Sequence, residues 1–256
     1  MQGTSEFEGR VVLVTGAERG IGRAIALAFA ARGARVAVDH ADDDTSAAQA
    51  ETVRREIARL GGEALVVRAD VRRAGDVASL ARTVEDGFGR IDVLVNNAGI
   101  YPRALVVEMD ERVFDDTVAV NLRGMFLCCR AVLPGMMARR DGRIVNLSSG
   151  AAFAPRARGA HYAATKAGIV GFSRALALEA GPYGITVNVV APGTVDTAQS
   201  RQELDDADFA ELATQIPLGR IGVPKDIAGA VLFFASESAA WITGQTLLVN
   251  GGKVMR

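Results

Sequence analysis

The chain has 256 residues, of which 49% are apolar and 23% are charged, and its 29 basic and 30 acidic side chains give a formal net charge of −1. Charges of mixed sign leave no broad basic surface for a phosphate backbone, so the composition argues against nucleic acid as the main partner. No apolar run approaches the roughly 20 residues of a membrane-spanning helix, and the first residues lack the apolar region of a signal peptide. We therefore expect a cytoplasmic protein with no membrane partner.

The cysteines and histidines offer little material for redox or metal chemistry. Cys128 and Cys129 are adjacent in an apolar stretch, where a structural disulfide between neighbours needs unusual backbone geometry, so we expect buried free thiols. His40 and His161 are far apart, with no cysteine near either. We expect no metal site.

Short runs rich in Val, Ile and Leu alternate with stretches of helical character. The predicted strands begin near Arg10, Ala34, Ala64, Ile91, Arg143, Thr186 and Thr246. The predicted helices cover residues 21–32, 47–60, 77–86, 113–139, 163–180 and 227–236. Each strand run is apolar almost continuously, which is typical of parallel strands that are covered on both faces.

This alternation predicts a single α/β domain over residues 1–256 with a Rossmann-type doubly wound fold. We expect a seven-stranded, mostly parallel sheet with helices on both faces, and ligands beyond the carboxyl ends of its strands. Two dense acidic runs, at residues 39–44 and 205–208, are expected in solvated loops or at helix starts.

A glycine-rich segment, TGAERGIG at residues 15–22, directly follows the first predicted strand. Gly16, Gly20 and Gly22 have the spacing G-x-x-x-G-x-G. Glycine there permits a tight turn and a close approach of the backbone to a pyrophosphate at the helix N-terminus. Such a segment can also be an ordinary turn, but its place between a strand and a helix favours a dinucleotide site.

Further motifs follow in a fixed order. Residues 96–99 read NNAG, Asn121 lies in the next predicted helix, Tyr162 and Lys166 form a Y-x-x-x-K pair, and residues 192–197 read PGTVDT. Ser149 follows the fifth predicted strand. Together these motifs resemble the short-chain dehydrogenase/reductase family over nearly the whole chain, and most of all its β-ketoacyl-carrier-protein reductase-like members. The resemblance implies that Ser149 rather than Ser148 is the catalytic serine, because it precedes Tyr162 by thirteen residues as the family's serine does.

The resemblance implies a nicotinamide dinucleotide as cofactor. The glycine-rich segment would hold the pyrophosphate, Asp70 the adenine amino group, residues 97–99 the central part, and Val195 with Thr197 the nicotinamide amide. The alternative for Asp70 is a cap on the following turn. The full set expected to bind the cofactor is Gly16, Arg19, Gly20, Ile21, Gly22, Asp39, Asp70, Val71, Asn97, Ala98, Gly99, Tyr162, Lys166, Pro192, Gly193, Val195 and Thr197.

The choice between NAD and NADP depends on the end of the second strand, where a carboxylate accepts hydrogen bonds from the ribose and repels a 2′-phosphate. Asp39 stands one residue before the family's usual aspartate, and His40 occupies that place. No Lys or Arg occurs between Arg35 and Arg54. The sequence therefore favours NAD over NADP, and Arg19 is the residue that would reverse this preference.

Tyr162 and Lys166 are four residues apart in a predicted helix and so share one face. A nearby ammonium favours the phenolate, which allows a tyrosine to exchange a proton near neutral pH. Ser149 can donate a hydrogen bond to the same substrate oxygen. The resemblance adds that Lys166 binds the nicotinamide ribose and that Asn121 orders a proton relay. His161 points about 100° away from Tyr162, so we expect it at the rim rather than in catalysis.

Each of these residues also has a structural interpretation: a core tyrosine, a surface lysine, a turn serine, and an asparagine that bonds its own helix. Taken together with the glycine-rich segment, they favour an oxidoreductase that moves a hydride between nicotinamide and a ketone or secondary alcohol. The alternative is a non-catalytic dinucleotide-binding sensor or scaffold.

Residues 196–216 are expected to form the substrate loop. Acids within it make a strongly anionic substrate less favourable, unless Arg201, Arg156 or Arg158 meets the charge. By analogy with the family we expect a homotetramer built from helices 113–139 and 163–180.

Overall fold

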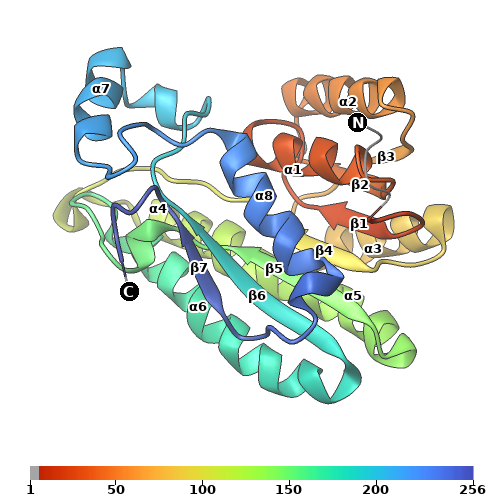
Figure 1. The fold of residues 1–256 in the computed structure, drawn as a ribbon. Helices are drawn as coiled ribbons and strands as arrows, with labels where there is room; N and C mark the ends of the chain where they lie inside the picture. The colour runs from red at the N-terminus through yellow and green to blue at the C-terminus, as the bar shows by residue number, and fades with distance from the viewer. Residues whose placement is uncertain (1–5, 256) are drawn as a thin grey trace.

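The computed structural model of the protein describes residues 6–255, and Figure 1 shows a sheet with helices on both sides. The strands are β1 (Val11–Val14), β2 (Arg35–His40), β3 (Ala64–Arg68), β4 (Val93–Asn96), β5 (Gly142–Leu147), β6 (Ile185–Pro192) and β7 (Thr246–Val249). The longer helices are α1 (Gly20–Ala30), α2 (Asp44–Arg59), α3 (Ala74–Phe88), α4 (Glu111–Val118), α5 (Met125–Arg139), α6 (Ala160–Ala180), α7 (Asp206–Thr214) and α8 (Pro224–Ala235).

The seven strands lie in the order β3-β2-β1-β4-β5-β6-β7, and every neighbouring pair is parallel. The chain thus builds outward from β1 in one direction and then from β4 in the other. The doubly wound, Rossmann-type fold is confirmed, and its switch point lies between β1 and β4, where such folds bind ligands.

The continuous apolar runs are explained by two separate cores. On β1, Val12 and Val14 face a core shared with α1, α2 and α8, whereas Val11 and Leu13 face a core shared with α3, α5 and α6. Because successive strand side chains point to opposite faces, a strand between two helical layers must be apolar at every position.

The predicted helix at 113–139 is in fact three pieces, α4, a π-helical turn η2 (Ala119–Gly124) and α5. By length and composition the run Glu111–Arg139 could cross a membrane. In this fold its Leu127, Cys129 and Val132 are buried in the core beside α3, which is how a core helix of a globular domain behaves. Cys128 and Cys129 are buried free thiols, as predicted.

The acidic runs begin helices, as expected, with one exception. Asp43 accepts hydrogen bonds from the backbone and hydroxyl of Ser46 and caps α2, and Asp205 forms a capping box with Asp208 at α7. Asp39 is instead 1% exposed at the end of β2, so the prediction of a solvated position was wrong for it. Helix α7, which was not predicted, lies within the expected substrate loop and stands away from the sheet in Figure 1.

Candidate active site

The glycine-rich segment turns sharply from β1 into α1. Gly16 and Gly20 have φ values of +59° and +55°, a region that disfavours side chains, and a Cβ on Gly22 would lie 2.1 Å from the carbonyl oxygen of Gly16. Helix α1 has no acid in its first turn, and no side chain in the described residues caps it. Its free N–H groups therefore suit an anionic group such as the pyrophosphate of a dinucleotide.

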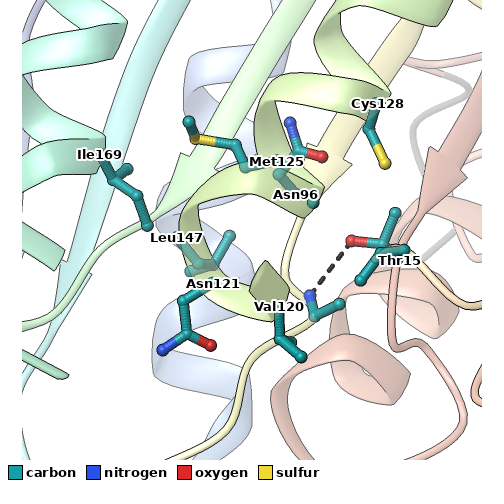
Figure 2. Close-up of a pocket in the computed structure, with 11 residues that line it drawn as sticks. Thr15, Asn96, Val120, Asn121, Met125, Cys128, Leu147 and Ile169 are labelled. Atoms are coloured by element: carbon teal, nitrogen blue, oxygen red, sulfur yellow. Dashed lines mark hydrogen bonds between the residues drawn. The ribbon is translucent and has the colours of Figure 1, made fainter. Parts of the chain in front are cut away.

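The end of β4 is tied to this segment by hydrogen bonds. The Asn97 side-chain amide donates to the carbonyl oxygens of Thr15 and Gly16, at 2.9 and 2.8 Å. The Thr15 hydroxyl accepts from the backbone N–H groups of Asn97 and Ala98, at 3.0 and 3.1 Å, and Figure 2 shows the second of these bonds. Thr15 was not among the predicted site residues, although it directly precedes the first glycine.

The loop after β6 covers the glycine-rich segment. Thr197 lies over Gly20, where an added Cβ would meet its side chain at 3.7 Å, and the Ser200 hydroxyl holds the turn by donating to Val195 O at 2.8 Å. Val195 is 6% exposed and pairs with Gly222 in an isolated bridge. Its backbone rather than its side chain is thus available to a ligand.

Two further expected cofactor residues begin this loop. Pro192 ends β6, and a Cβ on Gly193 would lie 2.8 Å from the Asn250 Cα, so the glycine is needed for packing against the chain after β7.

The end of β2 differs from the expectation. The Asp39 carboxylate lies beneath the glycine-rich segment and accepts from Gly16 N at 3.2 Å, and burial raises its pKa well above the ordinary value. His40 is 4% exposed, with its Nδ1 2.8 Å from Ala41 O. Asp39, which was expected to accept hydrogen bonds from the ribose, thus lies buried beneath the turn, and its role toward the cofactor stays a prediction.

Two arginines that are distant from β2 in the sequence lie at the rim of the site, where β2 ends. The sequence alone did not indicate that they are so close. Arg68, at the end of β3, lies 2.9 Å from Asp42, and Arg73 lies 3.9 Å from the same carboxylate. Asp70 accepts the backbone N–H and guanidinium of Arg72, which lower its pKa, so the turn-capping interaction is present. Val71 is buried beside Gly124.

Ser149, Tyr162 and Lys166 meet beyond β5. Ser149 follows that strand and interacts with the Tyr162 phenol, whereas the Ser148 hydroxyl donates to Lys166 O at 2.7 Å and is thereby occupied. The Lys166 ammonium donates to Leu147 O at 2.9 Å and lies 5.5 Å from the centre of the Tyr162 ring. The thirteen-residue spacing thus selected the serine that faces the tyrosine.

Burial dominates the acid–base properties of the pair in this state. It raises the pKa of Tyr162 to about 12, an effect that Ser149 partly opposes, and it lowers the pKa of Lys166 to about 8. The expectation was that the ammonium and an oxidised nicotinamide ring both favour the phenolate; in the chain by itself, desolvation outweighs the effect of the ammonium.

The Asn121 side chain forms hydrogen bonds with other segments rather than with its own helix. Its side-chain oxygen accepts from Ile100 N at 2.8 Å, and its amide donates to Ile100 O at 2.9 Å and to Thr165 at 3.3 Å. It lies in the π-helical turn η2, and such turns are frequent at functional sites. A Cβ on Gly99 would lie 3.3 Å from Asn121 Oδ1 and 3.5 Å from Lys166 Nζ, so both groups border Gly99.

Two aromatic neighbours of this site depart from expectation. Tyr101 stacks on Tyr162 with ring centres 4.1 Å apart, a contact that no sequence motif indicated. His161 is 1% exposed, and neither ring nitrogen has a partner within residues 6–255, so the predicted rim position was wrong. It lies at the start of α6, which packs on α4 and η2.

An uncapped helix at a doubly wound switch point, together with a Ser–Tyr–Lys group whose lysine is buried, defines a dinucleotide-dependent oxidoreductase that acts on CH–OH groups. The chain matches the family model described as enoyl-(acyl carrier protein) reductase over residues 16–253. It belongs to the short-chain dehydrogenase/reductase family, whose members move a hydride between a nicotinamide dinucleotide and a ketone or alcohol.

Similar proteins span nearly the full chain. A 3-oxoacyl-(acyl-carrier-protein) reductase of Synechocystis is 43% identical, over 96% of this chain and 97% of the relative. The Escherichia coli protein of that name is 42% identical, over 97% and 99%. A crystal structure from Sinorhizobium meliloti, assigned by name to the short-chain alcohol dehydrogenases, matches with a TM-score of 0.91 and 37% identity, over 97% and 98%.

Proposed function

We propose that this protein reduces the ketone of a 3-oxoacyl thioester, with Tyr162 as the acid and base, Ser149 as support for the substrate oxygen, and Lys166 as binder of the cofactor ribose. The observation that carries the proposal is the convergence of these three side chains beside the glycine-rich segment. The names of the similar proteins support the substrate class.

The chemistry that a bound nicotinamide dinucleotide supplies is hydride donation or acceptance at the substrate carbon. In the reduction, the Tyr162 phenol gives its proton to the ketone oxygen as negative charge develops there, and the Ser149 hydroxyl donates a second hydrogen bond to that oxygen. In the oxidation, positive charge near Tyr162 favours the phenolate and so offsets the effect of burial.

Proton supply to Tyr162 runs through its neighbours. The Lys166 ammonium is next to the ring, and Asn121 holds the Ile100 backbone at the opposite side of Gly99. We assign Asn121 the task of ordering the path between Lys166 and solvent.

For the cofactor we propose NAD rather than NADP. Asp42 and Asp43 follow β2, and Arg68 and Arg73 on that rim are already paired with Asp42, so a 2′-phosphate would find few free cations. Arg19, with its side chain 53% exposed, is the main opposing charge. For the other residues of the expected cofactor-binding set, we propose the roles that the resemblance to the family implies.

The substrate loop at residues 196–216 favours an uncharged reacting end. Arg201 is bound to Asp196 at 2.6 Å and to Asp206 at 3.0 Å, so it is not free to meet an anionic substrate. On the facing loop Val106 and Val107 are 71% and 92% exposed, which suits an acyl chain. Arg103 and Glu203 join the two loops at 3.1 Å.

We further propose that residues 1–256 act as a single domain in a cytoplasmic homotetramer. Phe114 and Phe126 are 46% and 39% exposed, and Leu178 on α6 is 81% exposed, so the helices expected at the subunit contacts carry apolar side chains on their free faces.

Tyr162→Phe tests the chemistry. The variant should lose at least about 10³-fold in kcat for ketone reduction, because the proton donor is gone, while NADH affinity stays within about threefold. Tyr183→Phe makes the same chemical change at the end of α6 and should retain activity. Reduction by Tyr162→Phe at the rate of the control would show that the phenol is not the acid and would revive the sensor or scaffold interpretation.

Initial rates with each reduced nucleotide test the substrate class. We expect higher kcat/KM for 3-oxoacyl thioesters than for simple ketones and sugars, because the acyl chain adds binding at the apolar loop. Equal rates for short ketones and sugars would contradict the assignment.

A further inference from the structure

Glu18 is an unusual side chain for its position. It lies within the glycine-rich segment, directly before Arg19, yet it is only 8% exposed. Its Oε2 atom is buried and has no hydrogen-bond partner within residues 6–255, and its nearest cation, Arg19 Nε, is 3.6 Å from Oε1. A buried carboxylate oxygen without a partner is costly, so its retention calls for a ligand that supplies the missing donor.

The surroundings of Glu18 place it beside the end of β2. Its carboxylate interacts electrostatically with His40 and Asp43, and it also acts on Asp39, whose Oδ1 is likewise unpartnered in the described chain. Burial raises the pKa of Glu18, in keeping with a carboxyl group that lacks water. Two carboxyl groups with free acceptor atoms thus lie together beside the uncapped start of α1.

The two acids are not equivalent. Asp39 already accepts from Gly16 N and is 1% exposed beneath the turn, so the backbone separates it from a ligand on the outer side. Glu18 belongs to the turn itself, on the strand-to-helix connection that faces an incoming dinucleotide. Of the two, Glu18 is therefore the side chain that can meet the sugar next to the pyrophosphate.

We propose that Glu18 selects NAD over NADP by accepting hydrogen bonds from the adenosine ribose hydroxyls and by repelling a 2′-phosphate. The two hydroxyls of the ribose are hydrogen-bond donors, and the unpartnered Glu18 oxygen is an acceptor. A 2′-phosphate at the same place supplies no donor and is repelled by the carboxylate, because both groups are negatively charged. This inference rests on the proposed function only in its assumption of a nicotinamide dinucleotide, and it replaces the surface role first expected for Asp39.

The test uses fragments without nicotinamide, so that binding is measured apart from catalysis. ADP-ribose and its 2′-phosphate are titrated by calorimetry into the wild-type chain, Glu18→Gln, Glu18→Ser and Asp44→Asn. Glu18→Gln keeps the shape and removes the charge, and Glu18→Ser opens the site. Asp44→Asn is the matched control, because it removes the same charge just after β2, at an exposed residue in the first turn of α2 that forms no ion pair in the described chain and so frees no cation.

The wild-type chain should bind ADP-ribose at least about tenfold more tightly than the 2′-phosphate. Both Glu18 variants should shift that ratio toward the 2′-phosphate by about tenfold or more, and Asp44→Asn by less than about threefold. The melting temperature of ligand-free Glu18→Gln should rise by about 2 °C, because an unpaired buried charge is removed.

The proposal is overturned if Glu18→Gln and Asp44→Asn shift the ratio equally, or if the wild-type chain prefers the 2′-phosphate. The outcome is separable from that of the proposed function. A ratio that responds to Glu18 in a protein whose Tyr162→Phe variant stays active would support the selection of NAD and contradict the chemistry. A ratio that does not respond to Glu18, in a protein whose Tyr162→Phe variant is inactive, would contradict only the role of Glu18 and would leave the proposed chemistry standing.

Discussion

Lys166 is a cation in a buried site, where its ammonium donates to Leu147 O and faces the Tyr162 ring, and no carboxylate of the described chain forms an ion pair with it. Burial lowers its pKa to about 8, against an ordinary value of 10.5. Below pH 8 both folded and unfolded chains hold the proton, and the folded state bears the full cost of the buried charge. Between pH 8 and 10.5 the unfolded chain holds more protons, so the free energy of unfolding rises with pH.

Lys166→Met should remove this dependence in the ligand-free protein. The wild-type free energy of unfolding should gain about 2 kcal/mol from this group between pH 7.5 and 9.5, and the variant should show no such gain. Urea unfolding at several pH values measures it. The raised pKa values of the buried thiols Cys128 and Cys129 act in the opposite direction within this range, and that of Tyr162 does so above pH 10. Because the variant keeps these groups, the difference in slope between the wild type and the variant measures the lysine.

Lys225→Met, at an exposed position on α8, is the control and should keep the wild-type slope. A slope that survives in Lys166→Met would mean that the buried lysine is not the titrating group.

At the scale of single residues, the sequence predicted most where spacing alone decides the geometry. The interval of four places Tyr162 and Lys166 on one helix face, whereas the interval of thirteen selected Ser149 only through the resemblance to the family. It failed where the outcome depends on which way a strand residue points: Asp39 lies under the turn. Tyr101 was not indicated because its stacking on Tyr162 joins segments about 60 residues apart, which no local pattern encodes.

Among the elements, the turn between β1 and α1 has the least space for change. A Cβ on Gly22 would meet Gly16 O at 2.1 Å and the Asn97 amide nitrogen at 2.6 Å, so the backbone or the bond to β4 must shift. Gly75, in the first turn of α3, has open space and no positive φ. Alanine variants of the two glycines therefore separate two effects on the free energy of unfolding: the cost of a side chain at this turn and the ordinary effect of alanine in a helix.

Gly22→Ala should lower the free energy of unfolding by about 2 kcal/mol and weaken NADH binding by more than about tenfold, because the overpacked turn moves the N–H groups of α1. Gly75→Ala should instead raise the free energy of unfolding by about 0.5–1 kcal/mol and leave NADH binding unchanged. Urea unfolding and fluorescence titration give both values. If Gly22→Ala binds NADH normally, the glycine-rich segment does not hold the cofactor.

The strands were predictable because most positions of a doubly covered strand are apolar. Each of the six predicted helical segments contains a helix of the structure, but the eight longer helices exceed that number because one segment is divided and α7 was missed. The π-helical turn η2 interrupts the predicted helix at 113–139. The side chain of Asn121 in this turn donates a hydrogen bond to Ile100 O, in another segment, rather than to its own helix. Helix α7 is short, and only Phe209 on it is buried, so its pattern gave little helical signal. Its capping box, not its apolar face, marks its start.

At the scale of the whole molecule, the surface of α4, α5 and α6 is where we expect the subunits of the proposed tetramer to meet. Phe126 is 39% exposed although it packs edge-to-face against Phe172 on α6, with ring centres 6.2 Å apart, and Arg130 lies over its ring. An aromatic pair at the free face of two long helices is the kind of anchor that interfaces use. We expect this face to meet its counterpart on a second copy in the proposed tetramer.

Phe126→Asp should therefore reduce the assembly to a smaller species, because each symmetric contact would bury two unpaired carboxylates. Light scattering should give about four times the chain mass of 26.9 kDa for the wild type and a lower multiple for the variant. Val107→Asp adds the same charge at a side chain that is 92% exposed on the substrate-side loop, and it should keep the wild-type mass. A monomeric wild type, or equal dissociation by both variants, would show that this helical face is not the subunit contact.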